Sequence, residues 1–570
     1  MAGWNTYKKR SFQSILVALV IVVLVNFLAA KQFYRWDLTK EKRYTLTPST
    51  KALLKDLDRQ INVTVYLDGK DLPAGIKKLR NSTRELLNEF RALSGGFIDY
   101  EFVDIYKIED AAVREQLEED LVKVGIYPTN LNVTETSGSS KKLLYPGAVF
   151  SNDERSIGIQ ILENQMTFNT QDVLNNSYNF LEFKLANTVK KLLQDRQYRI
   201  GILEGNGEVN TSRITDLGQH LATQDFFIKR INLSKQTLFG PSNKPDVLII
   251  PKPTEAFSEA AKFEIDQYIM SGGKVLWMID KVVADLDSFK VAPQFLAIER
   301  DLNLDDQLFR YGVRLNSDLV QDLYCNPIPV TEDIGGGQSQ TNLYPWVFHP
   351  VITMKDEHPI TKNIDPVALE FAGSIDTIKA SNIEKTVLLS TSEYTRISKA
   401  PVPLDLGIAR VDPLPEYFQL QDIPVAVLLE GQFRSLYDNR LTKDFIQRLL
   451  EVDKEFVNES VLTKQIVISD GDIGVNDIDV SGVPLPLGYY KFTKQTFANR
   501  DFLMNCIEYL LDDHGLISAR NKETQMQLLD KQKVMEKKGL WQVMNIGVPI
   551  IFMFIIGGWI RWRRNRKYVI

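Results

Sequence analysis

The chain has 570 residues, of which 44% are hydrophobic and 25% are charged, a composition typical of globular proteins and unlike that of disordered chains or membrane proteins with many spans. Its net charge is −5, and residues 31–538 alone carry −13, because eight basic residues near the two ends lie outside that range. This acidic region argues against nucleic acid or anionic lipid as its main partner.

Only two cysteines occur, Cys325 and Cys506, 181 positions apart. In an oxidising compartment they can form one disulfide, but a chain of this length does not require one, so two free thiols are the alternative. There is no Cys/His cluster with the spacing of a zinc site.

The first predicted element is an uncharged apolar stretch, residues 11–30, preceded by Lys8, Lys9 and Arg10 in a short tail of residues 1–10. A helix of this length rises about 30 Å, enough to cross the hydrocarbon core of a bilayer. We therefore predict a transmembrane helix over residues 11–30. A cleaved signal peptide is the alternative, but Leu28 stands where the cleavage site requires a small residue.

A juxtamembrane linker, residues 31–57, ends in a helix that we predict to begin at Thr47 and Pro48, because Thr is a favoured N-cap and Pro a favoured first helical residue. Residues 58–195 follow as a first α/β domain. Its predicted strands are residues 61–67, 97–105, 143–150 and 157–162, and its predicted helices are residues 76–93, 111–124 and 173–194. The β-α-β opening is similar to that of a thioredoxin fold, although the domain has no cysteine for thiol chemistry.

Residues 196–515 alternate Val-, Ile- and Leu-rich strands with amphipathic helices, which predicts a doubly wound, amidotransferase-like parallel sheet. The predicted strands are residues 199–203, 226–231, 247–251, 274–280, 386–390, 425–430 and 466–469, and the predicted helices are residues 214–223, 258–271 and 500–511. An insertion at about residues 281–385 is irregular, and we assign it no strand order.

The chain ends in a charged juxtamembrane helix, residues 516–538, a second predicted transmembrane helix, residues 539–560, and a basic tail, residues 561–570. The predicted membrane anchors at this end are Trp541, Trp559, Trp562, Arg561, Arg563 and Arg564. Because the basic residues flank both spans on their terminal sides, the positive-inside rule predicts that both termini are cytoplasmic and that the body between the spans is exported.

Two acidic loops are the candidate ligand sites. Residues 204–208, Glu-Gly-Asn-Gly-Glu, follow a predicted strand at a position where open α/β sheets bind ligands. They lack the third Gly of the dinucleotide fingerprint and the Lys of a P-loop, so a tight structural turn is the alternative. Residues 470–477 are similar in composition to a calcium loop but lack its Gly at the sixth position and its Glu at the twelfth. The candidate residues are Glu204, Asn206, Glu208, Asp470 and Asp472.

No catalytic constellation is evident. The four histidines are scattered, and no G-x-S-x-G elbow occurs on a predicted strand. We therefore predict no catalytic residue, no metal site and no cofactor, and we expect that the chain is not an enzyme.

Stretches spread over nearly the whole chain form one further pattern: residues 37–50, 201–208, 245–250, 272–276, 425–431, 466–472, 499–505 and 516–523. Together they resemble the GldG family, the gliding-motility-associated component of an ABC transporter, and more broadly the auxiliary domain found beside ABC-2-type permeases.

This resemblance implies a non-catalytic subunit of the bacterial inner membrane that works with an ABC-2-type permease and a separate ATPase. It also implies periplasmic protein partners, in gliding motility or secretion. A substrate-binding module that presents a ligand to the permease is the alternative, and an amidotransferase-like hydrolase is a weaker one. The resemblance supplies no ligand residues.

Overall fold

The structure is a computed structural model. It describes residues 16–17, 19–21, 45–69, 72–135, 138–163, 170–238, 244–335, 338–354, 358–380, 382–451, 455–521 and 537–568. The chain forms two compact units, Met1–Thr524 and Gln525–Ile570. Most of the first predicted transmembrane helix and most of both juxtamembrane segments lie outside the described residues.

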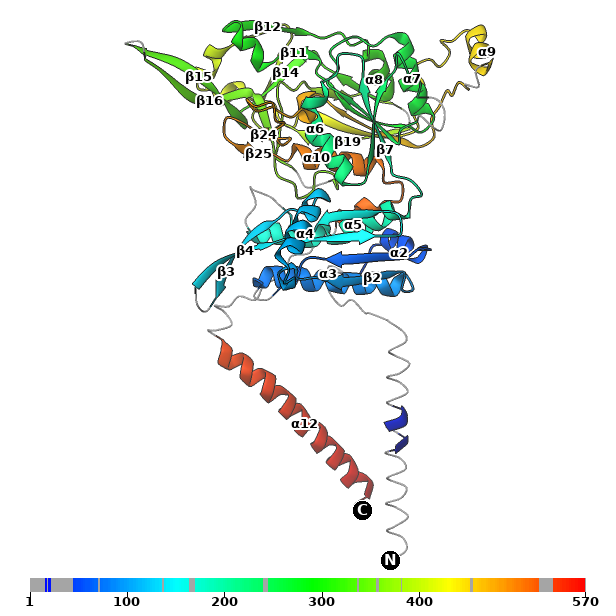
Figure 1. The fold of residues 1–570 in the computed structure, drawn as a ribbon, viewed down its shortest axis with the longest axis vertical. Coiled ribbons are helices and arrows are strands. Elements are labelled where there is room, and N and C mark those ends of the chain that lie inside the picture. The colour runs from blue at the N-terminus through cyan, green and yellow to red at the C-terminus, as the bar shows by residue number, and fades with distance from the viewer. Residues whose placement is uncertain are drawn as a thin grey trace, which may run out of the picture. The chain divides into compact units, whose positions relative to one another are not determined.

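The first sheet has four strands in the order β2-β1-β5-β6 (Figure 1). Its strands are β1 (Ile61–Val65), β2 (Ile98–Phe102), β5 (Gly147–Ser151) and β6 (Ser156–Gln160). The associated helices are α2 (Pro48–Lys55), α3 (Ala74–Leu93), α4 (Ala111–Lys123) and α5 (Thr170–Leu193), and a separate hairpin consists of β3 (Thr129–Glu135) and β4 (Gly138–Leu144). β1 is parallel to β2 and antiparallel to β5, which is antiparallel to β6.

Local sequence rules explain two boundaries in this region. α2 begins where predicted, because the Thr47 hydroxyl accepts a hydrogen bond from the Thr50 N–H. The single strand predicted over residues 143–150 is wrong, because β4 ends at Leu144 and β5 begins at Gly147. Pro146 lacks an N–H for strand pairing, and the Gly147 N–H turns back to the Tyr145 carbonyl at 2.9 Å.

The second sheet has seven strands in the order β19-β22-β23-β10-β9-β7-β8. The strands are β7 (Arg199–Glu204), β8 (Phe227–Asn232), β9 (Val247–Pro251), β10 (Lys274–Met278), β19 (Ile383–Ser390), β22 (Pro424–Gly431) and β23 (Thr463–Ile468). The helices of this part are α6 (Thr215–Thr223), α7 (Glu259–Met270), α8 (Asp305–Tyr311), α9 (Lys443–Glu451) and α10 (Asn499–Leu510).

The mixed α/β class predicted from the sequence is confirmed, but the wholly parallel sheet is wrong at one edge. β23, β10, β9, β7 and β8 are parallel, whereas β22 is antiparallel to β23 and β19 is antiparallel to β22. An antiparallel neighbour needs no helical crossover. The residue pattern of a buried strand does not reveal its direction, so this edge could not be read from the sequence.

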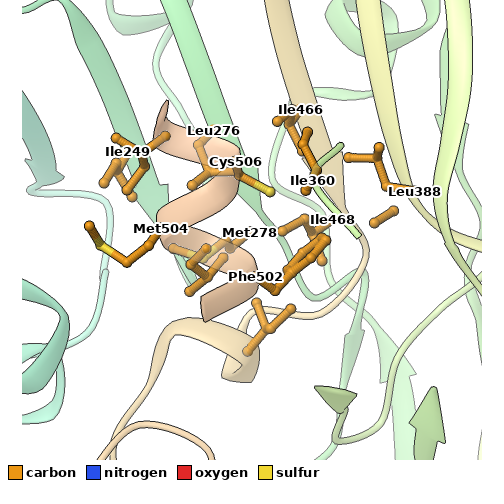
Figure 2. Packing of buried hydrophobic residues seen from close by; sticks show 14 of the residues in the cluster. Ile249, Leu276, Met278, Ile360, Leu388, Ile466, Ile468, Phe502, Met504 and Cys506 are labelled. Carbon is orange, nitrogen blue, oxygen red and sulfur yellow. The ribbon is translucent and has the colours of Figure 1, made fainter. Parts of the chain in front are cut away.

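Both faces of the seven-stranded sheet are buried. Along β10, Leu276 and Met278 face a core that includes α6 and α10, whereas Val275 and Trp277 face a core that includes α7 and α8. Figure 2 shows α10 crossing the sheet, with Phe502 and Cys506 among strand side chains. Alternate strand residues therefore serve opposite layers, as expected for a sheet covered on both sides.

The insertion, together with residues that follow it, forms a further apolar core around Trp346, which is fully buried. Its strands, with those that follow in the chain, are β11 (Val282–Val283), β12 (Gln294–Glu299), β13 (Val313–Leu315), β14 (Asp318–Asp322), β15 (Cys325–Gly335), β16 (Gln338–Ile352), β17 (Val367–Ala368), β18 (Ile375–Thr377), β20 (Thr395–Lys399), β21 (Val402–Asp405), β24 (Tyr489–Tyr490) and β25 (Gln495–Thr496). The β15–β16 hairpin projects from this part of the chain (Figure 1).

The two cysteines are free thiols, so the disulfide alternative is wrong. Cys506 is fully buried in the core beneath α10, whereas Cys325 is half-buried at the core of the insertion. The two side chains therefore belong to different apolar cores.

The C-terminal unit contains α12 (Lys538–Tyr568). Within it, residues Lys538–Arg566 are long and apolar enough to cross a membrane, because they contain an 18-residue window with a mean hydropathy of 2.1. The helix continues through the basic residues, where the Arg563 guanidinium lies 4.8 Å from the Trp559 ring centre and the Arg566 guanidinium 4.5 Å from that of Trp562. Such aromatic and basic pairs are typical of a helix end at a membrane interface.

The close contact between β6 and the end of α4 gives a test of this packing. A Cβ atom added at Gly158 would lie 2.4 Å from the Val124 carbonyl oxygen, a backbone atom that cannot move aside alone. We expect Gly158→Ala to lower the free energy of unfolding by about 1–3 kcal/mol, measured by denaturant unfolding of the full chain in detergent.

Gly218→Ala in α6 is the matched control, because the nearest atom to its added Cβ would be 4.0 Å away. This substitution should leave stability unchanged or raise it by about 0.5–1 kcal/mol. Equal effects of the two substitutions would contradict the packing of β6 against Val124.

Candidate functional site

A group of charged side chains lies where parallel strands of the seven-stranded sheet end. Lys252 follows β9, Asp280 follows β10, and Asp470 and Asp472 follow β23. Because these strands are parallel, their carboxyl ends meet at one edge, which is where open α/β sheets bind ligands. The Glu370 N–H donates a hydrogen bond to Asp470. Glu370 and these four residues are together called the edge cluster.

Lys252 lies at the centre of the edge cluster. Its Nζ is 2.5 Å from each carboxylate oxygen of Asp472 and 3.4 Å from Asp280 Oδ2. Carboxylate oxygens of Asp280, Asp470 and Asp472 all lie within 4.8 Å of one another. Lys252 has a positive φ of 49°, which is uncommon for a residue with a side chain and occurs where the surroundings hold the backbone in place.

Backbone hydrogen bonds hold the aspartates in position. Asp470 Oδ1 accepts from the Asp472 and Ile473 N–H groups at 2.7 and 3.2 Å, and its Oδ2 accepts from the Glu370 N–H at 2.7 Å. Asp280 Oδ1 accepts from the Gly471 N–H at 2.5 Å. A side chain at Gly471 would come within 2.8 Å of the Lys252 side chain, so glycine allows this approach.

The electrostatics of the cluster follow from one ammonium among several carboxylates. Burial lowers the pKa of Lys252, but the Asp472 and Asp280 carboxylates outweigh burial and raise it. Burial, together with the negative charges of Asp472 and Asp477, raises the pKa of Glu370 to about 8. Burial also raises the pKa of Asp470 well above its ordinary value. Glu370 therefore holds a proton near neutral pH.

The space beside the cluster is small. Glu370, Asp472 and Asp477 line a cavity of about 60 Å³ together with Tyr489 and Tyr490. Ligand pockets typically measure about 300–1,000 Å³, so this cavity is too small to enclose an organic substrate. Three aspartates are a ligand set that hard cations accept. Here the Lys252 ammonium already supplies positive charge between Asp280 and Asp472.

The structure brings together only part of the predicted ligand set. Asp470 and Asp472 belong to the edge cluster. Glu204 ends β7 and Asn206 and Glu208 follow it, and β7 is separated from β23 by β9 and β10. The loop after β9 contacts both groups.

The loop of residues 204–208 has the geometry of a tight turn. Its Asn206 carbonyl accepts from the Thr254 and Glu255 N–H groups at 3.0 and 2.9 Å. Glu208 Oε2 accepts from the Asn206 N–H at 2.6 Å, and burial raises the pKa of Glu208. A Cβ atom at Gly207, which has a φ of +72°, would overlap Thr254 Oγ1. Ligand binding by either predicted loop stays a prediction.

Sequence reasoning missed three members of the edge cluster. Lys252 and Asp280 stand at or just beyond the ends of two predicted strands, so the rule that parallel strands share a carboxyl edge could have identified them. Glu370 lies between β17 and β18 in the insertion, and no local pattern connects it with the sheet edge.

One family model covers more than half of the chain. Residues 197–506, more than half of the chain, match the family described as "ABC-type uncharacterized transport system", and residues 40–151 match a domain of unknown function, DUF7088. An uncharacterized protein of Borreliella burgdorferi is 20% identical over 568 residues, covering 98% of this chain and 99% of that protein.

Among solved structures, the chain is similar to the mmIFT52 N-terminal domain, with 14% identity, 55% of this chain and 98% of that chain covered, and a TM-score of 0.30. At this score the likeness supports no structural argument.

The raised pKa of Glu370 predicts a pH-dependent stability. Its carboxyl binds a proton more tightly in the folded state, with a pKa of about 8 against an ordinary 4.5, so the folded chain holds more protons between these pH values. The free energy of unfolding should therefore fall as pH rises through this window, by at most about 1.4 kcal/mol per pH unit. Glu370→Gln should flatten this fall, measured as the unfolding midpoint in detergent across the window. An unchanged pH profile in the variant would contradict the assignment to Glu370.

The ion pair at the centre of the edge cluster predicts non-additive substitutions. Lys252→Met leaves buried carboxylates without their counter-charge and should cost about 3–5 kcal/mol of stability at neutral pH. Lys252→Met combined with Asp472→Asn removes both charges and should recover part of that loss, as measured by a double-mutant cycle of unfolding free energies. Strictly additive effects would show that the pair contributes no coupling.

Proposed function

Because the chain belongs to the family of ABC-type uncharacterized transport systems, we propose that it is a membrane-anchored accessory subunit that couples a permease and its ATPase to periplasmic partners. The family suggests a transport-associated component that is not itself an enzyme. The finer parts are our proposal: the GldG-like identity, a role in gliding motility or secretion, the ABC-2-type permease and the separate ATPase.

The observation that supports this proposal best is that the two ends of the body meet on one helix. α2 lies at the end of the first juxtamembrane segment, and the 3-10 helix η7 (Leu516–Asn521) lies at the start of the second. Both pack against α5 and against each other. Two segments more than 450 positions apart in the sequence thus leave the body side by side, as expected if both lead to the same membrane.

Specific contacts hold this junction. The Thr47 N–H donates to Glu182 Oε1 on α5 at 2.6 Å. On the other side, the buried Arg520 guanidinium lies 4.3 Å from the Phe180 ring centre, and Ile517 packs against Phe183. α5 therefore binds both membrane-directed segments through buried contacts, and it offers a rigid route by which a movement at the membrane reaches the body.

We propose two spans, over residues 11–30 and 539–560, with both termini in the cytoplasm and the body in the periplasm of a bacterial inner membrane. The length and hydropathy of α12 support the second span. The proposed soluble domains are residues 58–195, thioredoxin-like, and residues 196–515, amidotransferase-like. The strand order β2-β1-β5-β6, with β5 antiparallel, is consistent with the thioredoxin-like description.

We favour coupling over presentation of a substrate because the cavity at the carboxyl edge, where such sheets bind ligands, measures only about 60 Å³. A substrate-binding module requires a cleft that encloses most of its ligand.

The test is a pull-down of the tagged full chain in mild detergent, with mass spectrometry of the co-purifying proteins. We expect a polytopic permease and an ATPase to be recovered. A variant with residues 539–560 replaced by an unrelated apolar helix of equal length, keeping Trp541 and the basic residues after Ile560, should lose both if the span binds the permease specifically.

A matched variant with the β15–β16 hairpin shortened keeps both membrane segments and should retain permease and ATPase. Recovery of neither protein with the native chain would reject the transporter proposal.

A further inference from the structure

An open groove of about 850 Å³, which does not enclose its contents, lies along α8. Its walls come from α8, from the end of β13, from residues 378–383 and from the loop after β22. No residue of the edge cluster lines it. The groove is therefore a second site, independent of the carboxyl edge of the sheet.

The groove is basic, although the chain is acidic. Six basic and three acidic side chains line it, a net charge of +3, whereas the whole chain carries −5. The three carboxylates are already paired: Asp305 and Glu299 with Lys281 at 2.7 and 3.2 Å, and Asp306 with the buried Lys262 at 2.8 Å. The carboxylates thus leave part of the positive charge of the groove uncompensated.

Two of the cations, Lys379 and Arg434, are exposed and form no ion pair among the residues that the structure describes. They lie on neighbouring segments, because Ile383 of β19 pairs with Gly431 of β22 and the Gln432 N–H donates to the Asn382 carbonyl at 3.2 Å. Other basic residues of the groove have acidic partners, such as Arg314 with Asp376 at 2.5 Å. Lys379 and Arg434 are thus available to an incoming carboxylate.

Apolar side chains lie beside these charges. Phe309 on α8 is 51% exposed and lines the groove with Leu315, Ile378 and Ile383. An exposed aromatic ring in a concave site is a typical anchor for a protein partner. A small inorganic anion would leave this apolar surface uncovered, whereas an acidic peptide can place carboxylates on the cations and an apolar side chain on Phe309.

We propose that this groove binds an acidic segment of a partner protein, whose carboxylates pair with Lys379 and Arg434 and whose apolar side chain packs on Phe309. Charge complementarity identifies the occupant, because the groove offers unpaired cations next to exposed apolar surface. The inference goes beyond the transporter role and does not depend on it.

The test uses the full chain in detergent and a short fluorescein-labelled peptide in which Asp and Glu alternate with Leu and Phe. We expect saturable binding by fluorescence anisotropy that weakens as salt is raised. Lys379→Glu combined with Arg434→Glu should weaken binding at least about tenfold, because both cations that face the peptide carboxylates become like charges. Phe309→Ala should weaken it by a smaller factor that does not change with salt.

The control carries the same change of charge outside the groove: Lys235→Glu combined with Arg396→Glu, two exposed cations that do not line it. This variant should bind within about twofold of the unmodified chain, because screening limits the effect of distant charges. A peptide with Asn and Gln in place of the acids tests the same pairing without altering the protein.

Several outcomes would overturn the proposal. The first is that the control variant loses as much binding as the groove variant, and the second is that the amide peptide binds as tightly as the acidic one. The third is that inorganic phosphate at matched ionic strength displaces the peptide fully. Finally, the chain could self-associate in sedimentation, with the groove variant abolishing that association. The last would assign the groove to a second copy of the chain.

Discussion

The structure depends on a seven-stranded sheet that is apolar on both faces. Each strand alternates side chains between two cores, so neither face can remain in water. Burying both requires α6 and α10 on one side and α7 and α8 on the other. In β7, β9 and β10 the charged residues stand only at the strand ends or beyond them, because a charge inside either core would lose its hydration without compensation.

The edge cluster is a consequence of that constraint. Parallel strands deliver the residues that follow them to one edge, and here those residues include three aspartates and a lysine. Their repulsion is balanced by the Lys252 ammonium, by backbone N–H donors to Asp470 and Asp280, and by the proton on Glu370. The result is a largely self-satisfied ionic group with little free volume. Its position is that of a ligand site, but its contacts are mostly internal.

The two ends of the body meet on a different part of the fold. α5 packs against both α2 and η7, which are far apart in the sequence. Contacts with this one helix therefore join the two segments. Lys190 and Lys191 on the same helix reach the C-terminal end of α10, where Lys190 Nζ donates to the Leu511 carbonyl at 3.0 Å and Lys191 Nζ lies 3.3 Å from Glu508 Oε1. This one helix therefore contacts a helix that covers the seven-stranded sheet as well as α2 and η7.

Local pattern alone determined much of the secondary structure. The strands and helices around residues 199–278, the cap at Thr47 and the apolar helix of residues 539–560 follow from periodicity, capping and hydropathy, which are properties of neighbouring residues. The local pattern also singled out Asp470 and Asp472 as candidate residues, because acidic residues after a strand are visible in the sequence. Tertiary structure decided the rest: the antiparallel directions of β19 and β22, the two free thiols, the order of strands in the insertion, the association of Lys252, Asp280 and Glu370, and the basic groove on α8. Each of these depends on which distant segments become neighbours, and that is set by the burial of two sheet faces rather than by any short stretch of the chain.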